Sequence, residues 1–339
     1  MAAAGPTIGE ENSFSTPGNR LQFDERKAFA MPKLLSDEQI REYQQDGLVF
    51  PIPVLSAAEV ATARAALEEL AAVLGGHAEV ARLRHLQPFH RWAQDLVLHP
   101  KVLDAVEDVL GPDILVHSSS VFWKRPHDPA YVSWHQDGFY VGLSELNYTS
   151  AWLALSDSSA DNGCMRVVRG SHRSGIVSHN RMAITPNNFV ALEIACQVKE
   201  SEATDVTLQP GEMSLHHVAA VHGSNPNASD RPRIGFAIRY ISPRVRQQLD
   251  HYPVILARGQ DRFGHYRILE ELPSFTLEEA IQAQAELAQW VLDSRASSVP
   301  VSLPPSCRLR WREAQSVAAG IGSSPTYRST SADVPGARP

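Results

Sequence analysis

The first third of the chain has apolar residues at the three- and four-residue spacing of amphipathic helices. Within 56–76 such residues form one helical stripe, and a Gly-Gly pair ends it. Ser36 with Gln39, and Ser56 with Glu59, have the spacing of capping boxes, in which side chains pair with the free amides at a helix start. The pattern therefore predicts helices that begin at Ser36 and Ser56.

After a further helix, expected over 100–110, the pattern changes to short apolar runs separated by turn residues. These runs are rich in β-branched and aromatic residues, which favour strands. They lie at 114–123, 149–155, 204–213 and 234–241. Thr276 with Glu279 then marks the start of a late helix, which we expect to pack on the outside. Helices around a core of short strands predict a mainly β fold with flanking α-helices and a jelly-roll (cupin-like) barrel.

The same pattern suggests one folded domain between two polar ends. Residues 1–33 lack apolar periodicity and are expected to form a flexible arm, and 298–339, rich in Ser, Pro, Ala and Arg, a disordered tail. We expect the domain, 34–297, to consist of a helical first part (34–112), a jelly-roll core (113–245) and a C-terminal helical extension (246–297).

Composition and charge exclude several classes of protein. The chain has 339 residues, of which 43% are hydrophobic and 20% charged, as in ordinary globular proteins. A net charge of −7 argues against nucleic acid or an anionic membrane as the main partner. No apolar run reaches the roughly 18 residues that span a bilayer, and the N-terminal residues lack the pattern of a signal peptide. The three scattered cysteines, Cys164, Cys196 and Cys307, suggest a reducing compartment, so we expect a cytoplasmic protein of unspecified oligomeric state.

The segment SWHQDGFY carries candidate metal ligands, His135 and Asp137. In an extended strand, side chains two residues apart project from the same face, so both can reach one ion. With a second histidine they would form the facial triad of non-haem Fe(II) oxygenases, which leaves three coordination positions open. His-x-Asp alone is a frequent chance motif, and Asp137-Gly138 is also a good turn dipeptide.

The third ligand is sought in the downstream segment 211–240, where His216, His217 and His222 compete. His222 opens HGSNPN, where a strand runs into a turn, and Arg233 follows eleven residues later at the start of another apolar run. An arginine there can hold the distal carboxylate of an oxo-diacid with two hydrogen bonds. His216 and His217 lack this continuation, so we expect structural roles for them.

Three segments together resemble the phytanoyl-CoA dioxygenase family of Fe(II)/2-oxoglutarate oxygenases. They are WHQDGFY, DNGCMRVVRGSHRSG (161–175) and VHGSNPN-x3-RPR (221–233), in the order and spacing of that family, and the resemblance extends over about 34–245. It implies a double-stranded β-helix fold, and a small-molecule substrate oxidised with O2. It also implies that His135, Asp137 and His222 bind Fe(II), and that Arg233 binds 2-oxoglutarate.

The resemblance implies further contacts to 2-oxoglutarate. Ser224, two residues after the last metal ligand, would add a hydrogen bond to the carboxylate on Arg233. Gln136, Trp152 and Lys124 match positions that often touch the oxo-acid. For two of them an ordinary alternative remains open, because Trp152 has the character of a core aromatic and Lys124 that of a surface cation.

The acid at position 137 bears on the reaction. Halogenases that resemble this chain around Trp134–Gln136 carry a small residue there, which leaves room for a halide on iron. A carboxylate ligand occupies that position, so hydroxylation of an unactivated C–H bond is expected, with 2-oxoglutarate decarboxylated to succinate and CO2. Desaturation, cyclisation or halogenation by the same chemistry are the alternatives. The family's Pro-Gly-Ser-His is replaced by Arg-Gly-Ser-His, beginning at Arg169. We expect this to change a turn and leave the chemistry intact, with Arg169 facing the substrate as the alternative.

Alternation along RIGFAIRYI places Arg239 on the same face as Arg233, past two small residues. We therefore predict that Arg239 lines the cavity and binds an anionic substrate group or an oxygen ligand of the iron. The alternative is an arginine at the barrel end, paired with an acid outside the pocket. Phe139, Tyr140 and Tyr148 are candidates for an apolar substrate wall or for barrel packing.

Other readings remain open at this level. Residues 176–203 are expected to form a lid or a plain surface insertion. A non-catalytic jelly-roll domain that binds a metal or ligand is the main alternative function, although it would not need Arg233 in register with the triad. A zinc hydrolase is disfavoured, because no further histidine cluster or general base is evident. The expected substrate is a secondary metabolite or an amino-acid-like compound.

Overall fold

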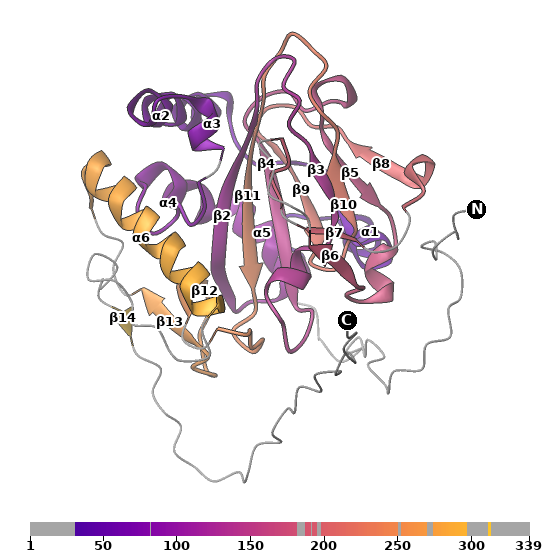
Figure 1. Ribbon diagram of the computed structural model, residues 1–339. Coiled ribbons are helices and arrows are strands. Elements are labelled where there is room, and N and C mark those ends of the chain that lie inside the picture. The colour runs from indigo at the N-terminus through magenta and orange to yellow at the C-terminus, as the bar shows by residue number, and fades with distance from the viewer. Residues whose placement is uncertain are drawn as a thin grey trace, which may run out of the picture.

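The protein is described by a computed structural model, which defines residues 31–81, 83–181, 187–190, 192–194, 198–249, 252–269, 274–296 and 311–312. Helices α2 (Ala57–Leu74), α3 (His77–Val80), α4 (Arg91–Val97) and α6 (Leu277–Ala296) lie on one side of the strands (Figure 1). The remaining helices of the described part are α1 (Asp37–Asp46) and α5 (Pro100–Leu110). No helix among these residues is long and apolar enough to cross a membrane.

The predicted helix starts are correct. Ser36 and Ser56 both form complete capping boxes, with Gln39 and Glu59 respectively. At the late helix, the Glu279 backbone amide donates to the Thr276 hydroxyl (3.3 Å), and the Thr276 amide donates to the Glu279 carboxylate (2.9 Å). These bonds satisfy amides that a helix start leaves free, so the sequence alone fixes these boundaries.

The strands form two main sheets. The larger has the order β1 (Leu48–Pro53), β9 (Glu212–His217), β4 (Tyr148–Ala154), β11 (Arg233–Ile241), β2 (Ile114–Lys124), β12 (Tyr252–Arg258), β13 (Tyr266–Leu269) and β14 (Trp311–Arg312). The smaller has the order β3 (Val132–His135), β10 (His222–Ser224), β5 (Met165–Val168) and β8 (Ala203–Val206). A separate pair consists of β6 (His179–Arg181) and β7 (Leu192–Ile194). Two sheets with helices outside confirm the predicted jelly-roll core.

The central strand β11 has two differently occupied faces. Ile234, Phe236, Ile238 and Tyr240 are buried in one cluster with apolar residues of α1, α2, α4 and α5. The Tyr240 hydroxyl also donates to the Val97 carbonyl at 2.8 Å, which ties the strand to α4. Each such side chain contributes about 1.5–3 kcal/mol on burial, so this face fixes the helical layer and the register of β11. The opposite face of β11 is therefore directed to the interior between the sheets.

The boundaries of the predicted parts are partly wrong. Residues 48–53 were assigned to the helical part, but they form edge strand β1, paired with β9. The expected helical extension, 246–297, begins with β12 and β13, which continue the large sheet before α6. Only Trp311 and Arg312 of the expected tail are described, as β14 beside β13, and residues 1–30 of the expected arm lie outside the described residues. Short apolar runs show too little periodicity to distinguish a strand from a helix. Their structure is therefore decided by hydrogen bonding to neighbouring strands, which the sequence does not reveal.

The run 204–213 is two strands instead of one. It contributes to β8 of the small sheet and β9 of the large sheet, with Pro210-Gly211 between them. Gly211 has φ +90°, and a Cβ there would stand 2.6 Å from the Leu55 carbonyl oxygen. Glycine is needed at this turn because the backbone conformation is left-handed and the space is filled. The turn lets one apolar run supply strands to both sheets.

Gly235 makes room for a large side chain in the interior. A Cβ on this residue would overlap the indole ring of Trp152 on the neighbouring strand β4. Trp152 is 4% exposed and packs with Met165 and Val167 of the opposite sheet. The missing side chain at 235 thus sets where the indole lies between the two sheets.

We expect Gly235→Ala to lower the free energy of unfolding by about 1–3 kcal/mol, because the added methyl group must displace the indole. Denaturant unfolding measures the change. In the double variant Gly235→Ala/Trp152→Leu the loss should be smaller than the sum of the two single losses. Strict additivity would show that the two positions do not compete for space.

Candidate metal centre

Two strands of the small sheet bring His135 and His222 together. They are direct partners across the antiparallel pair β3–β10, and their rings are 4.2 Å apart. Both side chains are buried. His135 Nδ1 donates to the Ser133 carbonyl (2.9 Å) and His222 Nδ1 to the Ala220 carbonyl (3.0 Å). With Nδ1 protonated and held in this way, each ring presents an unprotonated Nε2, the form that binds a metal.

Asp137 completes the group by a route that differs from the predicted one. Strand β3 ends at His135, and Asp137 opens a 3-10 turn, η1 (Asp137–Tyr140), after Gln136 in extended conformation. Asp137 Oδ1 nonetheless lies 3.7 Å from His135 Nε2. The potential ligand atoms of His135, Asp137 and His222 all lie within 4.8 Å of one another. The turn therefore delivers the carboxylate that an extended strand was expected to deliver.

The protonation states in this group suit a divalent metal. Burial acts to raise the pKa of Asp137, but Arg239 and the neighbouring imidazoles outweigh it and hold the pKa well below the usual range. Burial lowers the pKa of His222 well below its ordinary value. The site thus holds an ionised carboxylate and a neutral imidazole. Two imidazoles and one carboxylate are the donor set of the non-haem Fe(II) facial triad, and their chemistry fits that metal.

A second polar group lies at the other end of β11, around the Gly163 carbonyl. Arg233 is buried, and its Nε and Nη2 donate to this oxygen at 3.1 and 2.8 Å. The guanidinium also lies over the Trp152 ring, 5.4 Å from its centroid. Burial lowers the pKa of Arg233 to about 10, so the group remains a cation at neutral pH. The bonds just named occupy one edge of the guanidinium, and their partner is a carbonyl oxygen and not a carboxylate.

Lys124 and Ser224 belong to the same polar group. Lys124 is the partner of Arg233 across β11–β2, and it is buried, so it is not the surface cation considered from the sequence. Its Nζ donates to the Ser224 hydroxyl at 2.7 Å and also to the Asn225 carbonyl. Burial, with Arg233 adding to it, lowers the pKa of Lys124 to about 5, so the amine is neutral at pH 7. The structure thus brings together three of the predicted 2-oxoglutarate contacts, Arg233, Ser224 and Lys124.

Gln136 has a different environment from the predicted one. Its side-chain amide donates to the carbonyls of Gly175 (2.8 Å) and Ala219 (2.6 Å), and its oxygen accepts from the Val177 amide (2.9 Å). The Gln136 backbone amide donates to His179 Nε2 at 3.0 Å. The side chain is fully buried and engaged with backbone, so it has no group left for an oxo-acid. It connects the metal-ligand segment to residues 175–177 and to the loop before His222.

Arg239 lies at the metal centre, as the strand alternation predicted. Its Nε is 3.6 Å from Asp137 Oδ2, and its Nη1 donates to the Ser120 hydroxyl at 2.8 Å. The alternative of an arginine paired with an acid outside the pocket is thereby wrong. Arg169, a candidate to face the substrate, instead binds Glu42 and Asp46 of α1, both at 2.8 Å.

The three aromatic candidates have different surroundings. Tyr148 is buried in a core cluster, and its hydroxyl lies 3.4 Å from His117 Nδ1. Phe139 is 38% exposed and stacks on His179 of β6, with ring centroids 4.3 Å apart. The Tyr140 side chain lies outside the described part of the structure. Packing therefore accounts for Tyr148, whereas Phe139 remains available to a substrate.

Two further residues lie next to Asp137: Ser150, which was not singled out from the sequence, and His216, for which we expected a structural role. The Ser150 hydroxyl donates to Asp137 Oδ2 at 2.7 Å, and His216 Nε2 lies 3.8 Å from the same oxygen. Ser150 is the strand partner of both His216 and Arg239. Directly opposed residues project to the same face of a sheet, so these three form one row, here called the Asp137 row. The sequence gives the alternation within each strand, but it does not give the pairing that aligns the strands.

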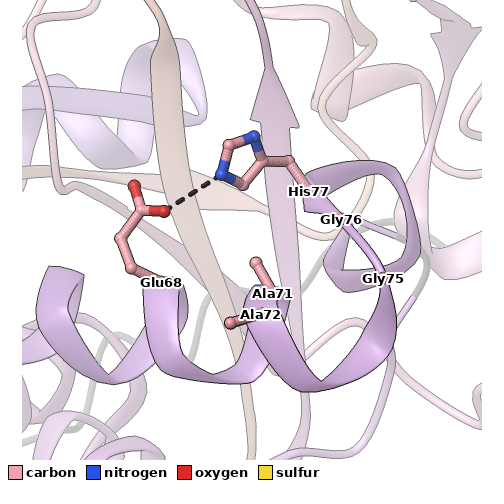
Figure 2. A pocket seen from close by; sticks show the side chains of 6 residues that line it. All are labelled: Glu68, Ala71, Ala72, Gly75, Gly76 and His77. Carbon is pink, nitrogen blue, oxygen red and sulfur yellow. Dashed lines mark hydrogen bonds and ion pairs between the residues drawn. The ribbon is translucent and has the colours of Figure 1, made fainter.

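A shallow hollow on the surface involves other elements. It is lined by Glu68, Ala71, Ala72, Gly75, Gly76 and His77, at the turn between α2 and α3 (Figure 2). In it the Glu68 carboxylate and His77 Nε2 are hydrogen-bonded at 3.0 Å (Figure 2). These residues are the end of one helix and the start of the next, so the hollow follows from the helix turn and is not part of the metal centre.

Gln136→Leu removes three hydrogen bonds and leaves their buried backbone partners unsatisfied. We expect the free energy of unfolding to fall by about 3 kcal/mol, because each unmade buried bond costs about 1–3 kcal/mol. Affinity for Fe(II) should fall as well, since the loop before His222 loses its support. Denaturant unfolding and metal titration measure both effects, with the exposed Gln45→Leu as the matched control. Full stability with weakened 2-oxoglutarate binding would instead support the sequence-based role of Gln136.

Comparisons with known proteins identify the chain's relatives. The model of the family described as Phytanoyl-CoA dioxygenase (PhyH) matches residues 43–235, more than half of the chain. A probable alpha-ketoglutarate-dependent hypophosphite dioxygenase of Stutzerimonas stutzeri is 29% identical over 181 residues, which cover 51% of this chain and 58% of the relative. A 1-deoxypentalenic acid 11-beta-hydroxylase of Streptomyces exfoliatus is 30% identical over 151 residues, with coverages of 41% and 52%. The chain thus spans little more than half the length of these two curated relatives.

Similar solved structures match a larger share of the chain than these curated relatives do. The apo form of the non-heme monooxygenase ThoJ is 33% identical, with a TM-score of 0.65, and the match covers 76% of this chain and 96% of that one. SnoK, a non-heme alpha ketoglutarate dependent carbocyclase from nogalamycin biosynthesis, is 27% identical with a TM-score of 0.52, and the match covers 64% and 89%. These findings confirm the predicted fold and, for the family, the predicted use of iron and 2-oxoglutarate. The chain belongs to the phytanoyl-CoA dioxygenase family.

Proposed function

We propose that this protein is an Fe(II)- and 2-oxoglutarate-dependent dioxygenase that hydroxylates an unactivated C–H bond of a small molecule. In the balanced reaction, substrate, O2 and 2-oxoglutarate give hydroxylated product, succinate and CO2. One oxygen atom of O2 enters the product and the other enters succinate. The observation that carries the proposal is the buried triad of His135, Asp137 and His222, with Arg233 on the same interior face as Arg239 of the Asp137 row.

Each part of the site has a distinct task in this proposal. His135, Asp137 and His222 hold the iron, which with 2-oxoglutarate and O2 supplies the oxidant that removes a substrate hydrogen atom. Arg233 binds the far carboxylate of 2-oxoglutarate, and the neighbouring Ser224 adds a hydrogen bond to it. Trp152 packs beside the guanidinium and excludes water from this pair, which strengthens it. The protein thereby orients the co-substrate and keeps the centre dry.

Asp137 supports hydroxylation over halogenation. Its carboxylate is ionised and is held by Ser150 at 2.7 Å, so it is ready to occupy a coordination position that a halide would need. Its negative charge also disfavours a second anion beside it. The observation argues against halogenation, and the placement of the substrate decides between hydroxylation, desaturation and cyclisation.

A secondary metabolite or an amino-acid-like compound is the proposed substrate class. Relatives named for 1-deoxypentalenic acid and for ectoine, the latter from Bordetella bronchiseptica, support small molecules of this kind. We also propose one catalytic domain over 34–297 and a cytoplasmic location. The latter is supported by the buried, free thiol of Cys164, as expected in a reducing compartment.

The proposal is tested by adding Fe(II) and 2-oxoglutarate to the purified protein without oxygen. We expect a visible charge-transfer band, which Asp137→Ala or His222→Ala abolishes. Arg233→Met should bind Fe(II) normally but lose roughly tenfold or more in affinity for 2-oxoglutarate, because a charge-assisted bond to the far carboxylate is lost. In oxygen with candidate substrates, we expect wild-type protein to form succinate, Arg233→Met to form less, and Asp137→Ala and His222→Ala to form none. A folded wild-type protein that gives neither band nor succinate would favour a non-catalytic binding domain.

A further inference from the structure

Two polar side chains on strand β9 are buried without a partner. Among the described residues, neither ring nitrogen of His216 has a hydrogen-bond partner, and the Ser214 hydroxyl has none either. His216 is 2% exposed and Ser214 fully buried. Buried polar groups in folded proteins nearly always have a hydrogen-bond partner. These atoms therefore point to a partner that the described part of the chain does not supply.

Strand pairing shows where both side chains face. Ser214 is opposite Trp152, and His216 is opposite Ser150, across β9–β4. Their face is the interior one, because the intervening Leu215 packs in the cluster under the helices. His216 thus belongs to the Asp137 row, and Ser214 to the next row, beside the indole that carries the Arg233 guanidinium. The side chains of His216 and Ser214 therefore lie on the interior face, between the metal centre and Arg233.

The chain's own groups near His216 do not satisfy it. The distance of 3.8 Å from its Nε2 to Asp137 Oδ2 exceeds a hydrogen bond, and that oxygen already accepts from Ser150 at 2.7 Å. The set of mutually close metal-ligand atoms contains His135, Asp137 and His222, without His216. His216 is therefore placed beside the metal centre but is neither one of its three ligands nor bonded to one.

We propose that His216 and Ser214 are 2-oxoglutarate-binding residues, and that His216 donates a hydrogen bond to the carboxylate at the metal-chelating end. The inference rests on the proposed function. With its far carboxylate on Arg233, 2-oxoglutarate would direct the near carboxylate toward the triad, beside the row that contains His216. An imidazole N–H and a carboxylate oxygen form a charge-assisted bond, which fits a buried donor that lacks a partner. Ser214 contacts the co-substrate between its two ends.

The first test compares 2-oxoglutarate binding in oxygen-free, Fe(II)-loaded variants by titrating the charge-transfer band. His216→Leu should weaken binding roughly tenfold or more, because a hydrogen bond to a charged group is lost. His216→Gln retains an N–H donor and should recover part of the affinity, and Ser214→Ala should lose roughly two- to tenfold. Affinity for Fe(II) should be unchanged in all three variants. His217→Leu, on the same strand but the opposite face, is the control and should leave 2-oxoglutarate affinity unchanged.

A second arm locates the contact by using 2-oxobutyrate, which has the chelating end but no far carboxylate. His216→Leu should lose the same factor with 2-oxobutyrate as with 2-oxoglutarate. Arg233→Met should lose affinity only for 2-oxoglutarate. An effect of His216→Leu that disappears with 2-oxobutyrate would overturn the placement at the chelating end.

Stability provides a readout that a structural role would not give. Because His216 is buried without a partner, His216→Leu should leave the melting temperature of the metal-free protein unchanged or raise it. Wild-type protein without a band would refute the proposed function itself. A band in wild type with equal 2-oxoglutarate affinity in His216→Leu would refute only this inference. A loss of Fe(II) affinity in His216→Leu would also refute it, since His216 would then act through the metal ligands.

Discussion

The buried charge of Asp137 is the constraint on which the rest of the site depends. A carboxylate taken out of water is strongly destabilising unless charges and hydrogen bonds compensate it. Here the compensation comes from the large sheet, through Ser150 and Arg239, while Asp137 itself follows a strand of the small sheet. The carboxylate therefore links the two sheets. A metal ion bound by the triad would add to this compensation, so the site is built around one negative charge held between two layers.

The two sheets contribute different residues to the site. The small sheet supplies the two imidazoles, which face each other across β3–β10 and are oriented by backbone carbonyls. The large sheet supplies the cations, with Arg239 at one end of β11 and Arg233 at the other. Between them β11 carries only small residues on its interior face, and Gly235 leaves the space that Trp152 fills. In the proposed function, 2-oxoglutarate lies between these two groups, with one carboxylate toward the triad and the other on Arg233.

The buried polar side chains near the metal centre differ in how many of their hydrogen-bonding groups have a partner. This difference distinguishes residues that stabilise the fold from residues that we propose bind a ligand. Gln136 has all its side-chain hydrogen-bonding groups engaged with backbone, and it holds together the segments that carry the metal ligands. His216 and Ser214 are equally buried, but they lack such partners within the described residues. A fully paired side chain stabilises the fold. A buried polar side chain without a hydrogen-bond partner lowers the stability of the fold. Such side chains beside the metal centre are therefore consistent with the proposed binding of a ligand there.

The sequence by itself determined the helix starts and the candidate reactive groups. Capping boxes fixed the starts of α1, α2 and α6, and alternation along β11 placed Arg233 and Arg239 on one face, because both signals are local. The family resemblance also pointed to His135, Asp137 and His222, whose potential ligand atoms lie within 4.8 Å of one another. Tertiary structure alone decided that Asp137 reaches the site from a 3-10 turn, that Lys124 is buried, and that Gln136 binds backbone. It also decided that His216 and Ser150 lie beside Arg239, because that row depends on the register between strands distant in sequence, which no local pattern encodes.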